Sequence, residues 1–368
     1  NGVTVVYSRY DESRHMTESR FQIIRCAAGS AYQRVVRSTL ERYRMLGLVK
    51  LVLPKSLVPM ARSVYYSAAG RGSRRQVEKR SKRIRNPQTF NEKVRYKAAF
   101  DRRPLLTEFA DKIQVRQLVS REVGSEFLTE CYATSFQVDD IPWEDFPREF
   151  VCKVNHGSGG VIVVWEGADP EKELPETPSA APWAKLQVHP DRASRARIAA
   201  LLNYWMTLDF VWPRGSPIVA WSYEGIRPGV LVEELLKTSD GGLPTDHKFF
   251  VMNGRVQMIR LDTPQPSGRK SMAHFDRNWN PLQVRFSEGG VTFDQTSPAP
   301  PQPPFLSEML RIAERLGRGT DFIRVDLYAL DDTRVVFGEL TNYPTAGNGK
   351  FIPRSFDRWL GESWVIDY

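Results

Sequence analysis

The feature that most limits what this chain can fold into is a glycine-rich turn between two strand-like runs. The turn GSGG, residues 157–160, separates "EFVCKVN" from "VIVVWE". The second run is β-branched almost throughout, and both runs favour strands. A P-loop or a dinucleotide-binding turn opens a helix instead. The turn is therefore expected to join two strands of one sheet.

The strand before the turn has one partly polar face. Alternation places Val151, Lys153 and Asn155 on one side and the apolar residues on the other. A lysine beside a glycine turn can contact phosphate oxygens, and the N–H groups of the turn can approach them because glycine has no Cβ. The pattern is thus typical of a phosphate site, with an ordinary Gly-Gly hairpin as the open alternative.

A second informative stretch is "DFIRVDLYALDDTRVVFGELTNYPTAGNGKF". Two strand-like runs flank "ALDD", which predicts a hairpin. Alternation places Arg324 with Asp326 on one face of the first strand. In the second strand it places Glu339 and Thr341 on the face of Phe337. If the connecting loop has an even number of residues, the sides of Asp326 and Glu339 coincide.

These carboxylates stand where a buried strand would carry apolar residues. Neighbouring buried carboxylates repel each other and need protons, a cation or hydrogen-bond partners. Mg²⁺ is one solution, since it takes one or two carboxylates and completes its octahedron with phosphate and water oxygens. Arg324 can neutralise a carboxylate or a transferring phosphoryl group. A purely structural Arg–Asp–Glu network is the alternative.

Composition bounds the remaining possibilities. The 368 residues carry a net charge of +9, and basic residues dominate between residues 20 and 103. This charge indicates a solvated face, an anionic polymer partner or lipid headgroups, with nucleic acid least favoured because no binding motif accompanies it. The three cysteines and five histidines show no metal-ligand spacing, which predicts a reducing compartment. A cytoplasmic protein is the expectation, with a location at the inner face of the membrane left open.

No signal peptide and no membrane-spanning run is expected, and His15-Met16 is compatible with a non-native leader over residues 1–15. Helices are predicted over 21–43, after Thr89 or Asn91, over 192–208 and over 305–316. A further helix is predicted from Thr107, as N-cap, to Gly124. Strands are predicted for "FLTECYAT", "FVCKVN", "VIVVWE", "GVLVEELL", "HKFFVMNGRVQMIRL", "FIRVDLYAL" and "TRVVFGEL".

Seven segments in this order resemble the ATP-grasp superfamily, and within it the TupA-like group named for teichuronopeptide biosynthesis. They are "TFNEKVRYKAAFDRRPLLTEFADKIQVR", "FVCKVNHGSGG", "LVEELL", "DHKFFVMNGRVQMI", "FDRNW", "FIRVDLY" and "FGELTNYPTAGNGKF". The resemblance covers roughly residues 86–361. It implies an α+β ATP-grasp fold in which two α+β lobes clamp ATP. Helical spacing and charge predict a mostly helical, basic N-terminal region in front of this fold.

The implied domains are a basic helical region 1–85, a helical segment 86–126, a small lobe 127–235 with the glycine-rich phosphate loop, and a C-terminal lobe 236–368 with the Mg²⁺-binding hairpin. ATP and Mg²⁺ are the implied cofactors. The implied nucleotide-binding residues are Lys153, His156, Gly157, Ser158, Gly159, Gly160, Glu233, Glu234, Leu235, Leu236 and Lys248. The implied catalytic residues are Arg324 and Lys248, and the implied metal ligands are Asp326, Glu339 and Thr341.

The sequence departs from the family at the second metal position. Many ATP-grasp enzymes have an E-x-N pattern there, whereas this chain has Glu339-Leu340-Thr341, with Asn342 one step later. A hydroxyl is a weaker magnesium ligand than a carbonyl, which puts a two-metal arrangement in question. Asn342 is expected to point the opposite way unless the strand bulges.

The resemblance implies an ADP-forming carboxylate–amine ligase working through an acylphosphate, in bacterial surface-polymer or specialised-metabolite biosynthesis. Its partners would be carboxylate and amine substrates, with an anionic polymer or a membrane surface contacting the basic N-terminal third. A sugar or small-molecule kinase on the same fold, and a non-catalytic binder of anionic polymers, are the alternatives.

Other polar residues admit two interpretations each. Lys112 and Arg116, four apart on a predicted helix, either contact the ligand or, as the favoured interpretation, are solvated charges. His156 is favoured as a hydrogen-bonded loop residue over an acid or base. The charged cluster around the proline-containing loop after "QMIRL" either binds a substrate carboxylate or is a plain surface cluster; it comprises Arg260, Arg269, Lys270 and His274.

Overall fold

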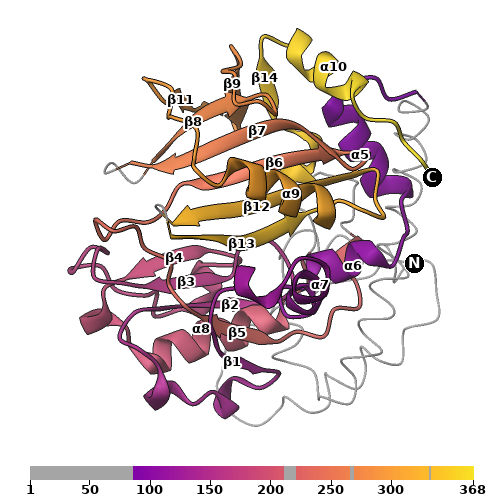
Figure 1. Ribbon diagram of the computed structural model, residues 1–368. Helices are drawn as coiled ribbons and strands as arrows, with labels where there is room; N and C mark the ends of the chain where they lie inside the picture. Colours follow the sequence, from indigo (N-terminus) through magenta and orange to yellow (C-terminus); the bar gives the residue numbers. More distant parts are fainter. Residues whose placement is uncertain (1–85, 211–220, 266–268, 331–332) are drawn as a thin grey trace, which may run out of the picture. The chain divides into compact units, whose positions relative to one another are not determined.

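The computed structural model describes residues 86–210, 221–265, 269–330 and 333–368, all within one compact unit, Ser67–Tyr368 (Figure 1). The predicted basic helical region 1–85 lies outside the described residues. Among the described helices, none is long and apolar enough to cross a bilayer. The α+β class predicted from the sequence is confirmed for this part of the chain.

One sheet carries the glycine turn and has the strand order β1-β5-β2-β3-β4. Its strands are β1 (Cys131–Ser135), β2 (Phe150–Val154), β3 (Val161–Val164), β4 (Lys185–Val188) and β5 (Val230–Glu233). Lys153 pairs with Val161 across the antiparallel β2–β3 hairpin, so the prediction that the turn joins two strands is confirmed. Cys152 and Val154 pack under helix α8 (Arg195–Thr207), which leaves Lys153 on the opposite face.

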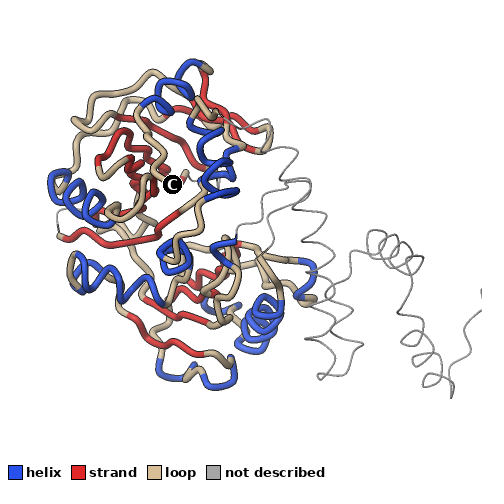
Figure 2. The backbone as a smooth tube through the Cα atoms, turned by 90° about the vertical axis from the view of Figure 1, so that its right-hand side faces the viewer, coloured by secondary structure: helices blue, strands red, loops and turns tan. Residues whose placement is uncertain are grey.

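The second sheet is six-stranded, with the order β11-β8-β7-β6-β12-β13. Its strands are β6 (Asp246–Met252), β7 (Arg255–Pro264), β8 (Lys270–Phe275), β11 (Asp294–Gln295), β12 (Phe322–Leu330) and β13 (Arg334–Thr341). Helix α9 (Leu306–Leu316) packs its apolar side on one face of this sheet, against Phe249, Ile259 and Val325 among others. Figure 2 shows the strands of both sheets in red, with helices flanking them.

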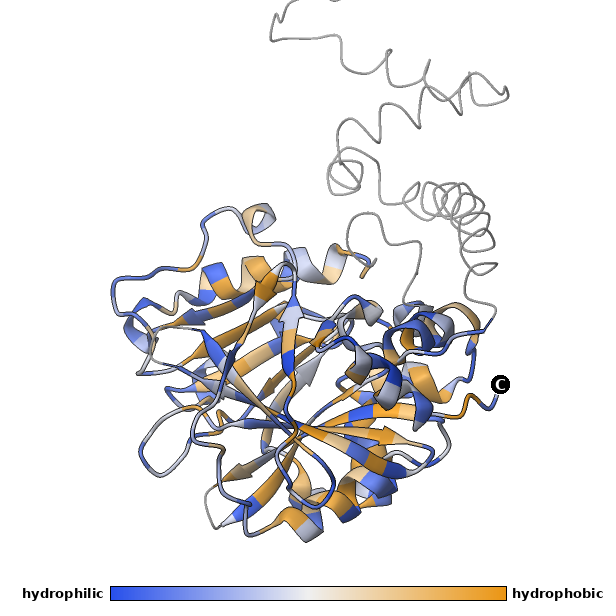
Figure 3. Cartoon of the chain, turned by 90° about the horizontal axis from the view of Figure 1, so that it is seen from above, coloured by the Kyte–Doolittle hydropathy of each residue, from blue (hydrophilic) through white to orange (hydrophobic). Residues whose placement is uncertain are grey.

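The other face of the six-stranded sheet is apolar over one half only. There Phe250, Met258 and Phe322 pack beneath helix α5 (Phe90–Phe100) and helix α10 (Ser355–Glu362). A small sheet joins this cluster through Phe286 and Phe351; it consists of β9 (Arg285–Glu288), β10 (Val291–Thr292) and β14 (Lys350–Ile352). Beyond Phe250 and Met258 the same face becomes polar, which positions the candidate site. Figure 3 shows apolar residues running along the strands.

The predicted helix from Thr107 to Gly124 is wrong, because two helices occupy this stretch. They are α6 (Leu105–Ala110) and α7 (Gln114–Glu122), and Thr107 lies inside the first. Asp111 separates them: its Oδ1 accepts hydrogen bonds from the backbone N–H of Ile113 at 2.9 Å and of Gln114 at 3.3 Å. Such a local side-chain bond competes with helix continuation and starts a new helix.

Most of the other predicted helices and strands are present, but their boundaries differ from the prediction. Thr89 caps α5 with a full capping box, as one of the two predicted caps. The strand predicted at "FLTECYAT" begins only at Cys131, after a short 3₁₀ turn at Ser125–Phe127. The short strands β4, β8 to β11 and β14, and helix α10, were not predicted. The remaining 3₁₀ turns are Val138–Asp140, Trp143–Asp145, Pro178–Ala180, Pro190–Arg192, Trp221–Tyr223 and Pro344–Gly347.

A β-bulge in the β12–β13 hairpin corrects a second prediction. Leu327 pairs with Phe337, but Asp326 pairs with Glu339, so Gly338 is the extra residue. Phe337 packs on the α9 side together with Leu340, which shows that the bulge reverses the alternation. Glu339 therefore does not share a face with Phe337. The number of residues between the paired Leu330 and Arg334 is odd, and it is the bulge that brings Glu339 to the side of Asp326.

Candidate functional site

A row of five polar residues crosses the polar half of the six-stranded sheet. Strand register places Glu339, Asp326, Lys248, Arg260 and His274 side by side on β13, β12, β6, β7 and β8. The odd-numbered neighbours of Asp326 face α9, so the row lies on the opposite face of the sheet. Asp326, Lys248, Arg260 and His274 are buried. An apolar sheet face would be more stable here, which marks the row as a candidate active site.

Asp326 is held between two cations. Arg324 donates to its Oδ1 from Nε at 2.7 Å and to its Oδ2 from a terminal nitrogen at 2.6 Å. Lys248 donates to Oδ2 at 2.8 Å and also contacts Asp246. Burial lowers the pKa of Arg324, but the charge of Asp326 outweighs it and raises that pKa. Burial likewise lowers the pKa of Lys248, but Asp326 and Asp246 raise it overall, so both cations are protonated and their contacts with Asp326 keep them in place.

Glu339 and Thr341 complete this end of the row. The Glu339 side chain is 45% exposed, and the Thr341 hydroxyl donates to its Oε1 at 2.6 Å. Arg324 donates to the same hydroxyl at 2.9 Å. Burial raises the pKa of Glu339, but Arg324, Lys185 and Lys112 lower it to about 2. Glu339 is consequently an anion at neutral pH, without a proton to compete with a metal ion.

The carboxylate oxygens at this end of the row suit one magnesium ion that takes few of its ligands from the protein. Among the described residues, no cluster of three or more His, Cys, Asp and Glu side chains is arranged around a metal position. Asp326 and Glu339 supply two neighbouring carboxylates, and Mg²⁺ commonly takes no more than that from protein. Asn342 is turned toward α6, on the side of the sheet away from the row, because its Nδ2 donates to the Leu106 carbonyl at 2.7 Å. The amide of the E-x-N pattern thus has no counterpart at this position.

The glycine turn is closely fitted by its surroundings. Gly157 and Gly159 have φ of 100°, and a Cβ on Gly159 would lie 2.1 Å from the carbonyl oxygen of Trp183. Lys112, between α6 and α7, donates from Nζ to the Gly157 carbonyl at 2.5 Å. The turn is therefore held from both sides by residues distant in sequence, and only glycine suits its backbone.

The favoured prediction of solvated charges for Lys112 and Arg116 is wrong. Lys112 lies in the link before α7, so the two residues do not share a helical face. Burial is the main cause that lowers the pKa of Lys112, to about 8; Lys153 and Lys185 lower it further, while Glu339 and Asp111 raise it. The amines around the glycine turn and the carboxylate of β13 are thus close enough to affect each other's ionisation.

The end of strand β5 contacts Lys153 beside the glycine turn, and it also contacts the β12–β13 hairpin. Glu233 forms an ion pair with Lys153 and accepts from Thr129 Oγ1 at 2.8 Å and from Arg116 at 3.3 Å. Glu234, facing the other way, pairs with Arg334 and accepts from the backbone N–H of Glu130. Only one of the two glutamates therefore joins Lys153, as their adjacency in a strand requires. Beyond β5, Leu236 packs against Leu330 and Val336.

His156 takes the structural position that its place in a turn predicted. Its Nε2 lies 3.1 Å from the Leu208 carbonyl oxygen, and its ring packs edge-on against Trp183. Burial is the main cause that lowers the pKa of His156. The ring is therefore neutral and supports the turn beside it.

Three residues of this region were missed by the sequence analysis. Lys185 lies on β4, Thr129 precedes β1, and Tyr223 lies in a 3₁₀ turn. Glu339 is among the groups that raise the pKa of Tyr223, after burial. None of the three stands in a distinctive local pattern, and only the sheet pairing of β3 with β4 brings Lys185 near the turn.

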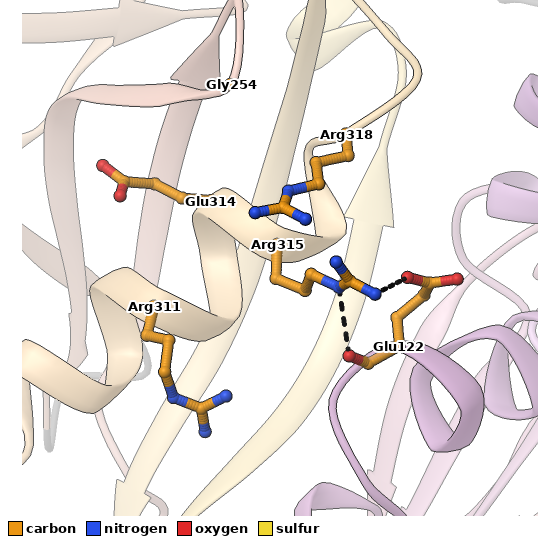
Figure 4. A pocket seen from close by; sticks show the side chains of 6 residues that line it. All are labelled: Glu122, Gly254, Arg311, Glu314, Arg315 and Arg318. Atoms are coloured by element: carbon orange, nitrogen blue, oxygen red, sulfur yellow. Dashed lines mark hydrogen bonds and ion pairs between the residues drawn. The ribbon is translucent and has the colours of Figure 1, made fainter.

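A separate hollow lies on the outer side of α9 and does not belong to the row. Arg311, Arg315 and Arg318 line it with Glu122, Gly254 and Glu314 (Figure 4). Arg315 pairs with Glu122 at 3.0 Å, and Glu314 accepts from Arg277 at 2.8 Å. These are exposed or half-exposed ion pairs, which typically contribute little and mark no particular chemistry.

Lys112 provides a pH-dependent prediction for this site. If its ammonium contacts a bound phosphate, binding raises its pKa from about 8, so the nucleotide is bound with uptake of a proton. Affinity for MgATP is then expected to fall by roughly tenfold between pH 7 and pH 9. Titration calorimetry at several pH values measures this change.

The matched control is Lys112→Arg, which stays charged throughout and should give a nearly flat profile. The shifted pKa of Lys112 also makes the free energy of unfolding depend on pH. The folded pKa lies below the unfolded value of 10.5, so the unfolded state binds more protons between these values and unfolding free energy rises with pH there. An identical pH dependence of nucleotide affinity in the arginine variant would exclude Lys112 as its origin.

A comparison with models of protein families agrees with the sequence resemblance over part of the chain. Residues 219–365 match the family model described as TupA-like ATPgrasp. No curated protein matches the sequence. The resemblance to this family is therefore confirmed for the part of the chain that contains β5 to β14. The glycine turn and helices α5 to α7 lie outside the matched range.

Solved structures of ATP-grasp ligases and related enzymes also match. D-alanine–D-alanine ligase from Bacillus anthracis matches at 13% identity and a TM-score of 0.33, with 65% of this chain and 59% of that one covered. ATP-grasp ligase PsnB with a minimal precursor matches at 9% and 0.33, covering 65% and 53%. The D-alanine–D-alanine ligase from Coxiella burnetii matches at 10% and 0.32, covering 64% and 47%. The chain spans less than two thirds of each.

Proposed function

We propose, from the family to which residues 219–365 are matched, that this chain is an ADP-forming carboxylate–amine ligase. The observation that carries the proposal is the arrangement around Asp326. Two buried cations, Arg324 and Lys248, hold this carboxylate beside an ionised Glu339. Phosphoryl transfer needs charge stabilisation of this kind more than it needs a protein nucleophile.

Nucleotide binding is assigned to the side of the glycine turn. Lys153 and Lys112 are proposed to contact phosphate oxygens, with N–H groups of residues 157–160 approaching the same oxygens. Glu233 is proposed to face the adenine or ribose, because it shares its face of the sheet with Lys153. Leu235 and Leu236 are proposed to give backbone contacts to the adenine between the two sheets.

Asp326 and Glu339 are the residues proposed to hold magnesium, with Thr341 beside them. The ion would supply charge neutralisation for the β- and γ-phosphates. Arg324 and Lys248 are already positioned by Asp326. When the carboxylate takes part in metal binding, their donors become available to anionic oxygens of the substrates.

The proposed reaction has two steps. A substrate carboxylate oxygen attacks the γ-phosphorus, a new P–O bond forms, and the bond to the ADP oxygen breaks. Arg324 and Lys248 stabilise the negative charge on the transferring oxygens. An amine nitrogen then attacks the acyl carbon, the C–O bond to phosphate breaks, and the amine proton leaves with phosphate or solvent. The products are an amide, ADP and phosphate.

The test is an incubation of the protein with MgATP and pooled carboxylic acids and amines. Mass spectrometry is expected to find a product lighter by one water than the sum of an acid and an amine, formed only with ATP. Amino acids and uronic acids are the first candidates. Asp326→Asn is the matched control and should lower product formation by at least about 100-fold.

The same experiment distinguishes the alternatives. A kinase would give a phosphorylated product without an amine and without free phosphate. A non-catalytic polymer binder would consume no ATP. Equal product formation by the wild type and Asp326→Asn would contradict the metal assignment.

A further inference from the structure

We propose that Arg260 and His274 form a subsite for a second, non-reacting anionic group of the acid substrate, either a carboxylate or a phosphate-type oxyanion. The identity of the ligand as the acid substrate rests on the proposed function. The location rests on the polar row itself. The prediction of a plain surface charge cluster is wrong for Arg260 and His274, because both side chains are buried. Of the other two residues in that prediction, Arg269 is exposed and Lys270 is partly exposed.

Strand register fixes the distance of the subsite from the reacting end. Arg260 lies two strands from Asp326, and His274 lies three strands from it. With about 4.8 Å between neighbouring strands, the backbones of Asp326 and Arg260 are roughly 10 Å apart. Long side chains shorten this separation. One small molecule with two acidic groups can therefore contact Lys248 and Arg324 at one end and Arg260 at the other.

His274 is incompletely hydrogen-bonded for a buried residue. Its exposed fraction is 3%, and neither ring nitrogen has a well-aligned hydrogen-bond partner, although the ring lies close enough to the Val284 backbone for that contact to raise its pKa. Burial is the main cause that lowers its pKa, to about 3, followed by the charge of Arg260; Asp262 and a backbone contact near Val284 act in the opposite direction. A neutral imidazole in such a place needs a partner, since buried polar side chains are bonded in the large majority of cases.

The charges beside His274 favour an anionic partner. Asp262 pairs with Arg260 at 2.8 Å and with Lys270 at 2.6 Å, so two cations share one carboxylate. The Arg260 guanidinium lies over the Phe286 ring, 5.0 Å from its centroid. This contact fixes the plane of the guanidinium and adds no counter-charge. The trio of Arg260, Lys270 and Asp262 therefore retains one positive charge next to an imidazole that can donate an N–H.

Arginine with a neutral imidazole is a suitable pair for an oxyanion. The guanidinium presents donors in a fixed fork, and the imidazole adds one more. The subsite would select substrates by a second acidic group while leaving phosphoryl transfer to the other end of the row. Arg260 and His274 are thus proposed as specificity residues.

The test measures binding to the full chain in the presence of MgADP by titration calorimetry. The probes are dicarboxylates from succinate to suberate, their monoamides, 4-phosphonobutyrate and inorganic phosphate. The wild type is expected to bind the best-fitting diacid at least about tenfold more tightly than its monoamide. Arg260→Gln should remove this preference and leave the monoamide and MgADP affinities within about twofold. 4-Phosphonobutyrate tighter than the diacid would identify the oxyanion as phosphate-type.

Two further variants accompany Arg260→Gln: one controls for the loss of a positive charge, and the other tests His274. Arg354→Gln removes an exposed positive charge of the C-terminal region and should behave as the wild type. His274→Gln keeps a donor and should weaken diacid binding by about threefold. The chain has five histidines, so the ring signals of His274 can be assigned by their loss in this variant. Diacid, but not monoamide, is expected to shift them.

The outcomes separate this proposal from the function that it extends. A wild type that binds MgADP yet shows no diacid preference overturns the subsite alone. A preference that persists in Arg260→Gln, or His274 signals that do not respond to diacid, overturns it as well. Inorganic phosphate that binds equally to the wild type and Arg260→Gln would be an adventitious ion only. Failure of the wild type to bind MgADP would instead overturn the proposed function.

Discussion

Replacing Arg324 by methionine is expected to lower kcat for acylphosphate formation by about 10²–10³-fold, while the Kd for MgATP changes by less than about tenfold. Arg324 is buried, and it contacts both oxygens of Asp326 and the hydroxyl of Thr341. It is thus held at the two carboxylates that are proposed to bind the metal ion, where negative charge would develop during the proposed transfer. Pre-steady-state ADP formation with saturating acid measures the effect.

The control for this variant is Arg324→Lys, which keeps the charge but not the two-pronged contact with Asp326. It should recover part of kcat, because a lysine ammonium cannot reproduce the fork of donors. Thermal unfolding of Arg324→Met reports the cost of leaving Asp326 with Lys248 alone, and that of Arg324→Lys reports the cost of losing the two-pronged contact. Equal losses in MgATP affinity and in kcat would indicate that Arg324 holds the structure of the site and does not stabilise the transferring phosphoryl group.

The β12–β13 hairpin shows how far sequence alone could predict this site. Alternation and the resemblance both identified Asp326 and Glu339 as the acidic pair. Alternation placed Glu339 on the wrong face because it assumes an unbroken strand, and the bulge at Gly338 is not visible in a two-residue period. The residues were predicted correctly as neighbours, but the physical reason for their meeting comes only from the structure.

The lysines around the glycine turn mark a second limit. Lys153 was identifiable because it precedes the turn in the same hairpin. Lys112 was named as a possible ligand contact but was favoured as a solvated charge, and Lys185 was not identified. Both approach the turn through long-range contacts, namely the α6–α7 link and the parallel pairing of β4. Long-range pairing leaves no local signal in one sequence. The break at Asp111 has a local cause, yet it depends partly on Asn155, whose Nδ2 donates to the same carboxylate at 2.9 Å.

The polar row illustrates why burial was the hardest property to predict. Arg260 precedes and His274 follows the proline-containing loop after "QMIRL", a context that equally suits exposed charges. Only the register of four strands aligns them with Lys248 and Asp326. The fold class and the order of the site segments were therefore accessible from sequence. The assembly of residues across strands was not.

Gly159→Ala is expected to destabilise the protein by about 2–5 kcal/mol and to weaken MgATP binding by at least about tenfold. Two costs add. Gly159 has φ of 100°, which an alanine adopts only with strain, and its Cβ would lie 2.1 Å from the Trp183 carbonyl oxygen. That oxygen belongs to the backbone just before β4, so relief of the clash requires the strand or the turn to move.

Gly241→Ala is the matched control because it isolates the first cost. Gly241 has φ of 82° but nothing within 4 Å of an added Cβ. This variant should lose only about 1–2 kcal/mol and keep the MgATP affinity of the wild type. Denaturant unfolding and calorimetry compare the two.

If both variants lost stability equally and both bound MgATP normally, the close approach of Trp183 would be irrelevant to the turn, and the turn would have no part in holding phosphate. A larger loss of MgATP affinity in Gly159→Ala alone is expected, since the displaced backbone carries the N–H groups that are proposed to meet the nucleotide.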